Sequence, residues 1–204
     1  MNDEQGVISE TEAIRADIYQ LLASLIRQPP DTELLEWLAT LESDADGSRL
    51  AECWAALIQA ARSSTPEALS RAHFNHLVGV IQGDIVPYAS FYLNGELMDS
   101  ALVALRRDLR MLGFERRDAV HEPEDHLAAE CEVMAMLIVA SRDEQVDFFQ
   151  RHIAPWAGRC FADMGRLENA FYAATGQLGS AFIESERASM EAQAAYRPVR
   201  IMTP

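Results

Sequence analysis

The sequence predicts an all-α protein that folds as a single-domain helical bundle, and three observations lead to this fold class. Apolar residues recur at helical spacing along most of the 204 residues. Only the run 88–93 favours a strand, and the sequence offers no second run to pair with it. No motif repeats at a period of about 20 to 50 residues. We expect the helical domain over 10–187, between a flexible N-terminus (1–9) and a loosely ordered C-terminal tail (188–204).

Four helices are expected in the first part of the chain. The pair Pro29-Pro30 ends the first of them, because proline cannot continue a helix. Asp31 is a typical cap for the second, and Pro66 fits the first position of the fourth. Their expected ranges are 10–27, a segment that starts after Asp31, 49–62 and 66–78.

The connection 79–95 breaks the helical pattern. Gly83, Pro87 and the pair Asn94-Gly95 interrupt it. Since a lone strand is not stable, we expect an ordered loop or an irregular helix start here. A helical pattern then returns over 97–112 and stops at Gly113, a residue typical of helix ends.

The helix expected over about 123–141 is apolar on nearly all sides, which predicts a central, buried position with the other helices packed around it. Glu122 is its expected cap. Pro123 suits its first position, because the missing N–H would have no partner there. Glu124 and Asp125 would follow in the first turn, where backbone N–H groups and the helix dipole favour carboxylates.

Three more helical patterns follow, over 144–153, 155–174 and 177–187. Gly176 is expected to separate the last two. Periodicity is lost from about residue 191, and this loss predicts the loosely ordered tail.

Composition excludes several kinds of partner. The chain has 32 acidic and 17 basic side chains and a formal net charge of -15, which repels nucleic acid and anionic membrane surfaces. No apolar signal core begins the chain, and the apolar run 133–140 is too short to span a bilayer. We therefore expect a cytoplasmic protein without stable membrane insertion. The three widely separated cysteines predict buried free thiols.

Three functional classes stay open on the residues alone. A metal-dependent helical-bundle enzyme would use His126 and Glu130, which lie four residues apart on one helix face. The two-histidine signature and a second Glu-x-x-His pair are missing, so we expect neither metal nor catalysis. A non-catalytic helical scaffold is the second class. A peptide-binding protein is the third, because the aromatic connection 79–95 and the acidic run 122–126 offer apolar walls beside charges.

Several segments together carry a family resemblance. They are Phe74-Asn75-His76-Leu77-Val78-Gly79, Pro87-Tyr88-Ala89-Ser90-Phe91-Tyr92-Leu93, Leu105-Arg106-Arg107-Asp108-Leu109, Glu122-Pro123-Glu124-Asp125-His126 with Glu130, and later Phe148-Phe149, His152-Ile153, Pro155-Trp156 and Phe171-Tyr172. In this order they resemble the TorD/DmsD-like redox-enzyme chaperones. The chain departs from the family where Leu77-Val78-Gly79 replaces the more common Leu-Phe followed by a small residue.

The resemblance implies an all-helical cytosolic chaperone that catalyses no reaction. Such a chaperone binds the twin-arginine signal peptide and the apo form of a molybdoenzyme catalytic subunit, and assists cofactor insertion and maturation before export. No tightly bound cofactor is implied, only transient contact with molybdopterin guanine dinucleotide or a guanine nucleotide. Because helical bundles with long connections can exchange elements between chains, we expect a monomer or an exchange-type dimer.

The resemblance also implies a signal-peptide site. The family's Asp-His pair carries over to Asp125 and His126, and replacing either of them by alanine is expected to weaken peptide binding with little loss of helicity. Glu122 and Glu124 extend the acidic patch, because arginine forms bidentate bonds to carboxylates. The positions carried over for the apolar groove are Tyr19, Phe74, Leu77, Pro87 and Tyr88.

Overall fold

The computed structural model describes residues 8–43, 46–79, 82–116 and 121–195. These residues are mainly helical and contain no β-strand, which confirms the predicted all-α class. The elements are α1 (Glu10–Arg27), α2 (Thr32–Thr40), α3 (Arg49–Arg62), α4 (Pro66–His73), η1 (Phe74–Val78), α5 (Ala89–Asn94), α6 (Ser100–Leu112), α7 (Leu127–Val139), α8 (Glu144–Phe148), η2 (Phe149–Ile153), α9 (Ala157–Met164) and α10 (Ala170–Ala195). The elements η1 and η2 are π-helical turns that continue α4 and α8.

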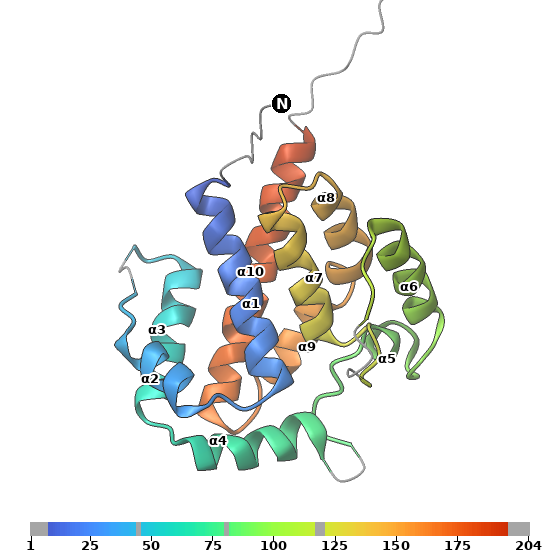
Figure 1. The fold of residues 1–204 in the computed structure, drawn as a ribbon. Helices are drawn as coiled ribbons and strands as arrows, with labels where there is room; N and C mark the ends of the chain where they lie inside the picture. The colour runs from blue at the N-terminus through green and yellow to red at the C-terminus, as the bar shows by residue number, and fades with distance from the viewer. Residues whose placement is uncertain (1–7, 44–45, 80–81, 117–120, 196–204) are drawn as a thin grey trace, which may run out of the picture.

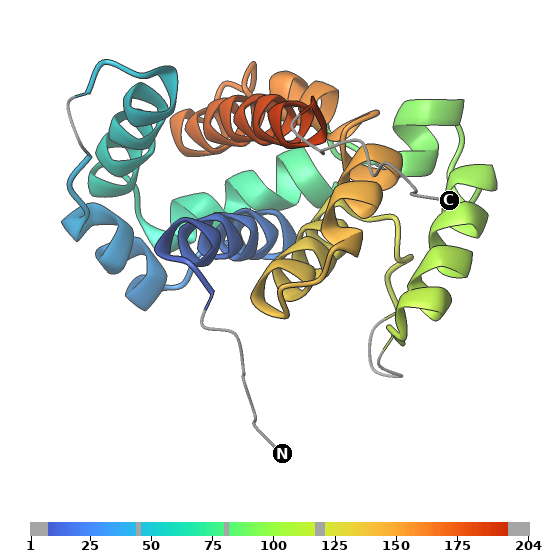
Figure 2. The ribbon, with the colours of Figure 1, turned by 90° about the horizontal axis from the view of Figure 1, so that it is seen from above.

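Three helices share the core of the bundle. Helix α1 packs along α7, and α10 packs against α9 and α3 (Figure 1). Helices α2 and α3 lie at one end of the molecule, whereas α5 and α6 lie at the other (Figure 2). The six largest fully buried side chains come from α1, η2, α9, α10 and the turn before α9, and none of them from α7. The central position predicted for the helix over 123–141 is therefore not confirmed.

The first helices begin as their sequences predict. A capping box opens α1, because the Ser9 hydroxyl accepts from the Glu12 backbone N–H and the Glu12 carboxylate accepts from the Ser9 N–H. The Asp31 carboxylate caps α2 by accepting from the Leu34 N–H at 2.8 Å. Proline occupies the first turn of α4. Local capping chemistry alone accounts for these helix starts.

The predicted start of the helix over 123–141 is wrong. Helix α7 begins four residues later, at Leu127, and its cap is His126 and not Glu122. Residues 123–125 form a turn before it, so Glu124 and Asp125 do not lie in a first helical turn. Met136 and Val139 are exposed, so α7 is also less completely buried than predicted. Pairing with residues before α5 holds His126 in an extended conformation, and this long-range contact overrides the local helix signal.

The break predicted at Gly176 is also misplaced. The chain leaves the helix after Met164 and re-enters it at Ala170, and α10 then runs through Gly176 without interruption. The Asn169 side chain caps α10 by accepting from the N–H groups of Phe171 and Tyr172, both at 3.1 Å. Helix α10 continues to Ala195, so the first part of the predicted tail is helical. Residues 196–204 lie outside the described residues.

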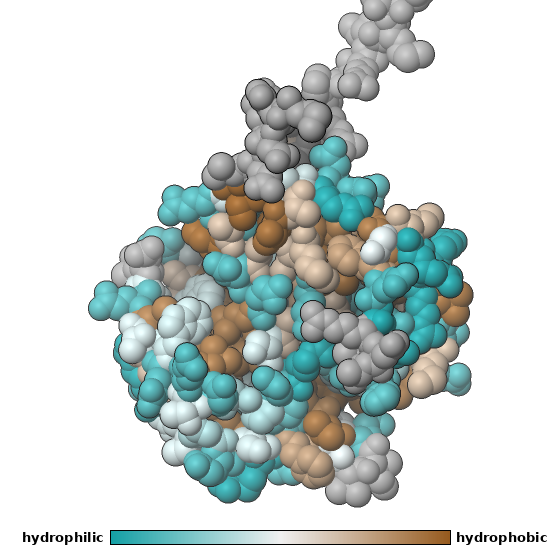
Figure 3. Space-filling view, viewed as in Figure 1, coloured by the Kyte–Doolittle hydropathy of each residue, from teal (hydrophilic) through white to brown (hydrophobic). Residues whose placement is uncertain are grey.

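The surface mixes polar and apolar groups. In Figure 3 the face is mainly teal, and brown areas interrupt it in several places. The three cysteines, Cys53, Cys131 and Cys160, are free and buried, as predicted. None of the described helices has the length and apolar character needed to cross a membrane.

Candidate functional site

Two distant backbone segments meet between α5 and α7, and we call residues 87–90 together with 125–127 the joint. The Ala89 N–H donates to the Asp125 carbonyl at 2.9 Å, and the Leu127 N–H donates to the Pro87 carbonyl at 2.8 Å. Tyr88 and His126 face each other in this antiparallel bridge. The joint therefore fixes the starts of both helices and brings the two most specific sequence segments into contact.

Asp125 lies inside the joint. Its side chain is fully buried, and Oδ2 accepts from the Ser90 N–H at 3.0 Å and from the Ser90 hydroxyl. The carboxylate thus caps the short helix α5 from a distant part of the chain. The other carboxylate oxygen, Oδ1, has no hydrogen-bond partner among the described residues. Asp125 consequently offers no surface carboxylate. Its role as the cap of α5 also does not fit the expectation that its removal costs little helicity.

His126 is also buried, and it pairs with Tyr88 inside the joint. Its Nδ1 accepts from the Ala128 N–H at 3.2 Å, so the neutral ring carries its proton on Nε2. Burial lowers the pKa of His126 to about 4, and the positive charge of Arg27 acts in the same direction, against Glu122 and Asp125. The imidazole is therefore uncharged at neutral pH and acts as a cap in the fold.

Glu122 is the accessible member of the acidic run. Its side chain is 37% exposed, and Oε1 accepts from the Tyr88 hydroxyl at 2.6 Å. The Tyr88 ring packs edge-to-face on the His126 ring, with centroids 5.0 Å apart. The second oxygen of Glu122 lies 3.9 Å from a guanidinium nitrogen of Arg27, which is held by Glu132 at 2.8 Å. An arginine of this chain thus already lies beside the carboxylate that a peptide arginine would need.

Glu124 has two arginine partners of its own. Arg106 on α6 donates to its carboxylate at 2.8 Å, and Arg116 lies 3.7 Å from the other oxygen. Arg116 also donates to the Glu122 carbonyl at 3.2 Å. Both glutamates of the acidic run, Glu122 and Glu124, therefore already lie beside arginines of this chain, and a peptide arginine would have to replace one of these.

The predicted groove residues fall into two groups. Phe74 is 46% exposed on η1 and Tyr88 is half-buried, so both are accessible. Leu77 and Pro87 are buried below them. Tyr19 is a core residue with no exposed surface, and its hydroxyl donates to Glu186 at 3.1 Å. The structure therefore places Tyr19 away from any surface groove.

The end of α4 brings Phe74 toward the joint. His73, the residue before it, forms a 3.0 Å hydrogen bond to the Ile26 carbonyl at the end of α1. Charge interactions of His73 with Glu122 and His126 place it close to both. Phe74 and the neighbouring Val78, which is 51% exposed, thus supply exposed apolar surface on η1, the turn that follows His73.

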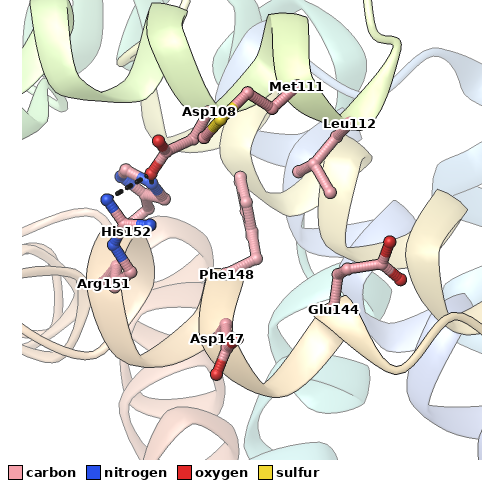
Figure 4. Close-up of a pocket in the computed structure, with 8 residues that line it drawn as sticks. All are labelled: Asp108, Met111, Leu112, Glu144, Asp147, Phe148, Arg151 and His152. Atoms are coloured by element: carbon pink, nitrogen blue, oxygen red, sulfur yellow. Dashed lines mark hydrogen bonds and ion pairs between the residues drawn. The ribbon is translucent and has the colours of Figure 1, made fainter.

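A buried ion cluster between α6 and η2 was missed by the sequence reasoning. The Asp108 carboxylate binds His152 at 2.8 Å and Arg151 at 2.7 Å (Figure 4). The cluster lines a pocket of about 240 Å³, with Phe148 and Met111 as apolar wall. Burial lowers the pKa of His152, against the neighbouring carboxylate. No local signal links Asp108 to residues so far away in sequence, because their contact is purely tertiary.

The geometry does not support the pairing required by the metal-enzyme alternative. Glu130 accepts from the Trp156 ring N–H at 3.0 Å, whereas His126 interacts with Ala128 and Glu122. Across the described residues, no group of three or more His, Cys, Asp or Glu side chains is arranged to hold a metal ion.

Solved structures place this fold in a known class. A crystal structure described as that of a redox enzyme maturation protein from Archaeoglobus fulgidus matches with a TM-score of 0.57 at 18% identity. The match covers 90% of this chain and 99% of that one. At this level of identity the similarity concerns the fold, an all-α bundle of the redox-enzyme maturation type.

Sequence comparison then gives the family. The family model described as nitrate reductase delta subunit matches residues 43–162, more than half of the chain. The chaperone protein TorD of Shewanella pealeana is 25% identical over 95% of this chain and 97% of its own length, and that of Aliivibrio fischeri is 28% identical over 83% and 91%. The chain therefore belongs to the nitrate reductase delta subunit family, the TorD family of redox-enzyme maturation chaperones.

Proposed function

We propose that this chain binds the twin-arginine signal peptide of a molybdopterin-containing oxidoreductase in the cytoplasm, and assists cofactor insertion and maturation of that enzyme before export. The observation that carries the proposal is the accessible Glu122 carboxylate, together with the exposed apolar side chains Phe74 and Val78 on η1. A twin-arginine peptide presents the complementary pattern, two guanidinium groups followed by an apolar segment.

Charge and apolar contact have different roles in this proposal. Exposed ion pairs contribute about 0 to 1 kcal/mol each, whereas micromolar affinity needs about 8 kcal/mol net. Apolar burial at roughly 25 cal/mol per Å² must therefore supply most of the affinity. The net charge of -15 accelerates the encounter with a cationic peptide, and Glu122 orients it.

Binding to Glu122 requires an exchange of partners. The peptide arginine would take the place of Arg27, which is only 3.9 Å from Glu122 and keeps its stronger bidentate contact with Glu132. The Tyr88 hydroxyl can stay on the other carboxylate oxygen during this exchange. The contacts with Tyr88 and Arg27 thus hold the Glu122 carboxylate in position before the peptide binds. Replacing the long contact with Arg27 should cost little free energy.

The test uses a synthetic twin-arginine signal peptide and a version with both arginines changed to lysine. We expect wild-type protein to bind the first at least tenfold more tightly by fluorescence anisotropy. Glu122→Gln is expected to weaken binding several-fold, and Phe74→Ala more strongly, with thermal unfolding nearly unchanged because both side chains are partly exposed.

Glu184→Gln is the matched control, since it removes one negative charge from an exposed position on α10 without touching the joint. Equal binding of the two peptides, or wild-type affinity in the Glu122 and Phe74 variants, would reject the proposed site.

Two further parts of the proposal rest on the family resemblance. Contact with molybdopterin guanine dinucleotide or guanine nucleotide is proposed as transient, at the moment of cofactor insertion. The oligomeric state is proposed as a monomer or an exchange-type dimer, which analytical ultracentrifugation would distinguish. Neither is needed for peptide binding at Glu122.

A further inference from the structure

A second pocket lies between α5 and α6 and extends to Glu130 on α7. Its volume is about 490 Å³, within the range of small-molecule and side-chain pockets. Small and apolar side chains form most of its wall. Three ionisable side chains also line it: Glu130, Arg151 and His152. Ala89, the first residue of α5 and part of the joint, also lines the pocket.

Glu130 has an unused hydrogen-bonding atom in this pocket. The side chain is 1% exposed, and Oε2 accepts from the Trp156 ring N–H at 3.0 Å. The other oxygen, Oε1, is buried without a hydrogen-bond partner among the described residues. Buried polar atoms almost always have a hydrogen-bond partner, because a buried atom without one has lost its bonds to water and gained none in exchange. An unpaired carboxylate oxygen on a residue that lines a pocket therefore points to a ligand that donates hydrogen bonds.

The charges around the pocket favour a cationic donor. Arg151 also lines the pocket, but it is held by Asp108 at 2.7 Å, so its charge is already balanced. Asp125 lies near enough to act electrostatically on Glu130, and its own Oδ1 is likewise buried and unpaired. The carboxyl groups of Glu130 and Asp125 thus have no cationic partner among the described residues, whereas Arg151, the arginine of the pocket, is already paired with Asp108.

We propose that this pocket receives one arginine side chain of the client's signal peptide, with the guanidinium against Glu130 Oε1; this inference rests on the proposed function. The alanines of the wall suit the aliphatic stem of arginine. A guanidinium loses hydration more easily than an ammonium and has donors that point in several directions. The peptide would then be held at two places, Glu122 on one side of the joint and Glu130 on the other.

The variant Glu130→Gln tests the role of the carboxylate. Glutamine keeps the size of the side chain and an acceptor for Trp156, so the fold is expected to persist, and only the ability to ionise against a bound guanidinium is removed. We expect the affinity for the twin-arginine peptide to fall at least tenfold, with Glu184→Gln again unchanged as the control for net charge. Single arginine-to-lysine peptides should show which arginine loses its effect in the variant.

A second variant, Ala104→Leu, fills the pocket from α6 without changing any charge. It should weaken the same peptide at least tenfold, while its thermal unfolding stays close to that of the wild type. If Glu130→Gln fails to fold, this variant and the single-lysine peptides still decide the outcome.

Proton release gives an independent measurement. Burial raises the pKa of Glu130 well above its usual range, and Asp125 acts in the same direction. A guanidinium would stabilise the ionised carboxylate, so peptide binding should release protons from wild type and none from Glu130→Gln. Calorimetry in two buffers of different ionisation enthalpy measures this number. The other titratable or charged groups around Glu130 are Asp125, Cys131, Arg151, His152 and Cys160.

The outcomes separate the two proposals. Wild-type affinity in both Glu130→Gln and Ala104→Leu would overturn the pocket assignment, and a buried water would then be the partner of Oε1. Weak binding by Glu122→Gln would still support the proposed function in that case. If the wild type does not prefer the twin-arginine peptide over its lysine version, both proposals fail.

Discussion

Asp125 shows how one carboxylate can matter for binding without contacting a ligand. Its Oδ2 accepts two hydrogen bonds from Ser90, at the start of α5, and the residue is fully buried. We expect Asp125→Ala to lower the free energy of unfolding by about 1 to 3 kcal/mol, because the cap is lost and the N–H of Ser90 is left without its partner. Urea denaturation measures the change. Peptide binding should fall together with stability, through displacement of α5.

Ser90→Ala is the matched variant for this prediction, since it removes the hydroxyl donor and keeps the backbone one. Its loss of stability should be smaller than that of Asp125→Ala. A fully stable Asp125→Ala protein that binds no peptide would instead indicate direct contact with the ligand.

His126 is expected to make the fold sensitive to acid. Its pKa falls from the usual 6.5 to about 4 in the folded protein, chiefly because the ring is buried. The stabilisation from the neutral ring is fully present above pH 6.5 and is lost progressively as the pH falls toward 4, where the unfolded chain binds the extra proton. The shift corresponds to about 3 kcal/mol. Burial also lowers the pKa values of His73 and His152, in the same direction.

Urea midpoints at pH 7.5 and pH 4.5 test this prediction. His126→Asn keeps an oxygen that can accept from the Ala128 N–H and has no group that titrates in this range. The variant should therefore lose less stability on acidification than the wild type. An equal loss in both proteins would assign the acid sensitivity to other groups.

At the scale of elements, the close approach of α9 and α10 depends on Gly176. A Cβ at this position would lie 2.6 Å from the Phe161 carbonyl oxygen and even closer to the Gly165 nitrogen. We expect Gly176→Ala to destabilise the protein by about 1 to 3 kcal/mol, although alanine normally favours a helix. Gly158→Ala is the control on α9, because its Cβ would meet nothing closer than 3.9 Å. Thermal unfolding should show a loss for the first and no loss for the second.

Gly176 also explains why the sequence pattern places the break between the last two helices wrongly. In the sequence a glycine between two apolar helical patterns favours a break. In the structure the same glycine allows a close helix contact, while the break falls where Asn169 can cap. Which of the two roles a glycine has depends on its neighbour in space, and the local sequence does not contain that neighbour.

The start of α7 is the second element that local rules could not place. Proline and two carboxylates are typical of a helix start, and this pattern predicted one at Pro123. The structure uses the same residues in a turn, since the pairing of His126 with Tyr88 requires extended backbone. The acidic residues could be predicted as a group. Their different environments, with Asp125 buried, Glu122 accessible and Glu124 paired with arginines, could not.

At the scale of the whole molecule, the fold class followed from helical periodicity, because that signal is repeated in every segment and survives local errors. Family membership followed from several short motifs spread over the chain, which the match over residues 43–162 confirms. The Asp108 cluster and the Glu130 pocket could not be predicted, because each joins residues from helices that are far apart in the sequence. Sequence pattern thus predicted the residue types of the proposed peptide site and not their accessibility.

The joint has a consequence for how the protein opens. Its two backbone hydrogen bonds connect a segment before α5 with a segment after α6. Because each bond holds the starts of α5 and α7 together, we expect the two bonds to open at the same time. The α5–α6 unit should therefore unfold as one cooperative unit, separately from the α1, α7 and α10 core. In native-state amide exchange, the N–H groups of Ala89 and Leu127 should share a single opening free energy, even though they are far apart along the chain.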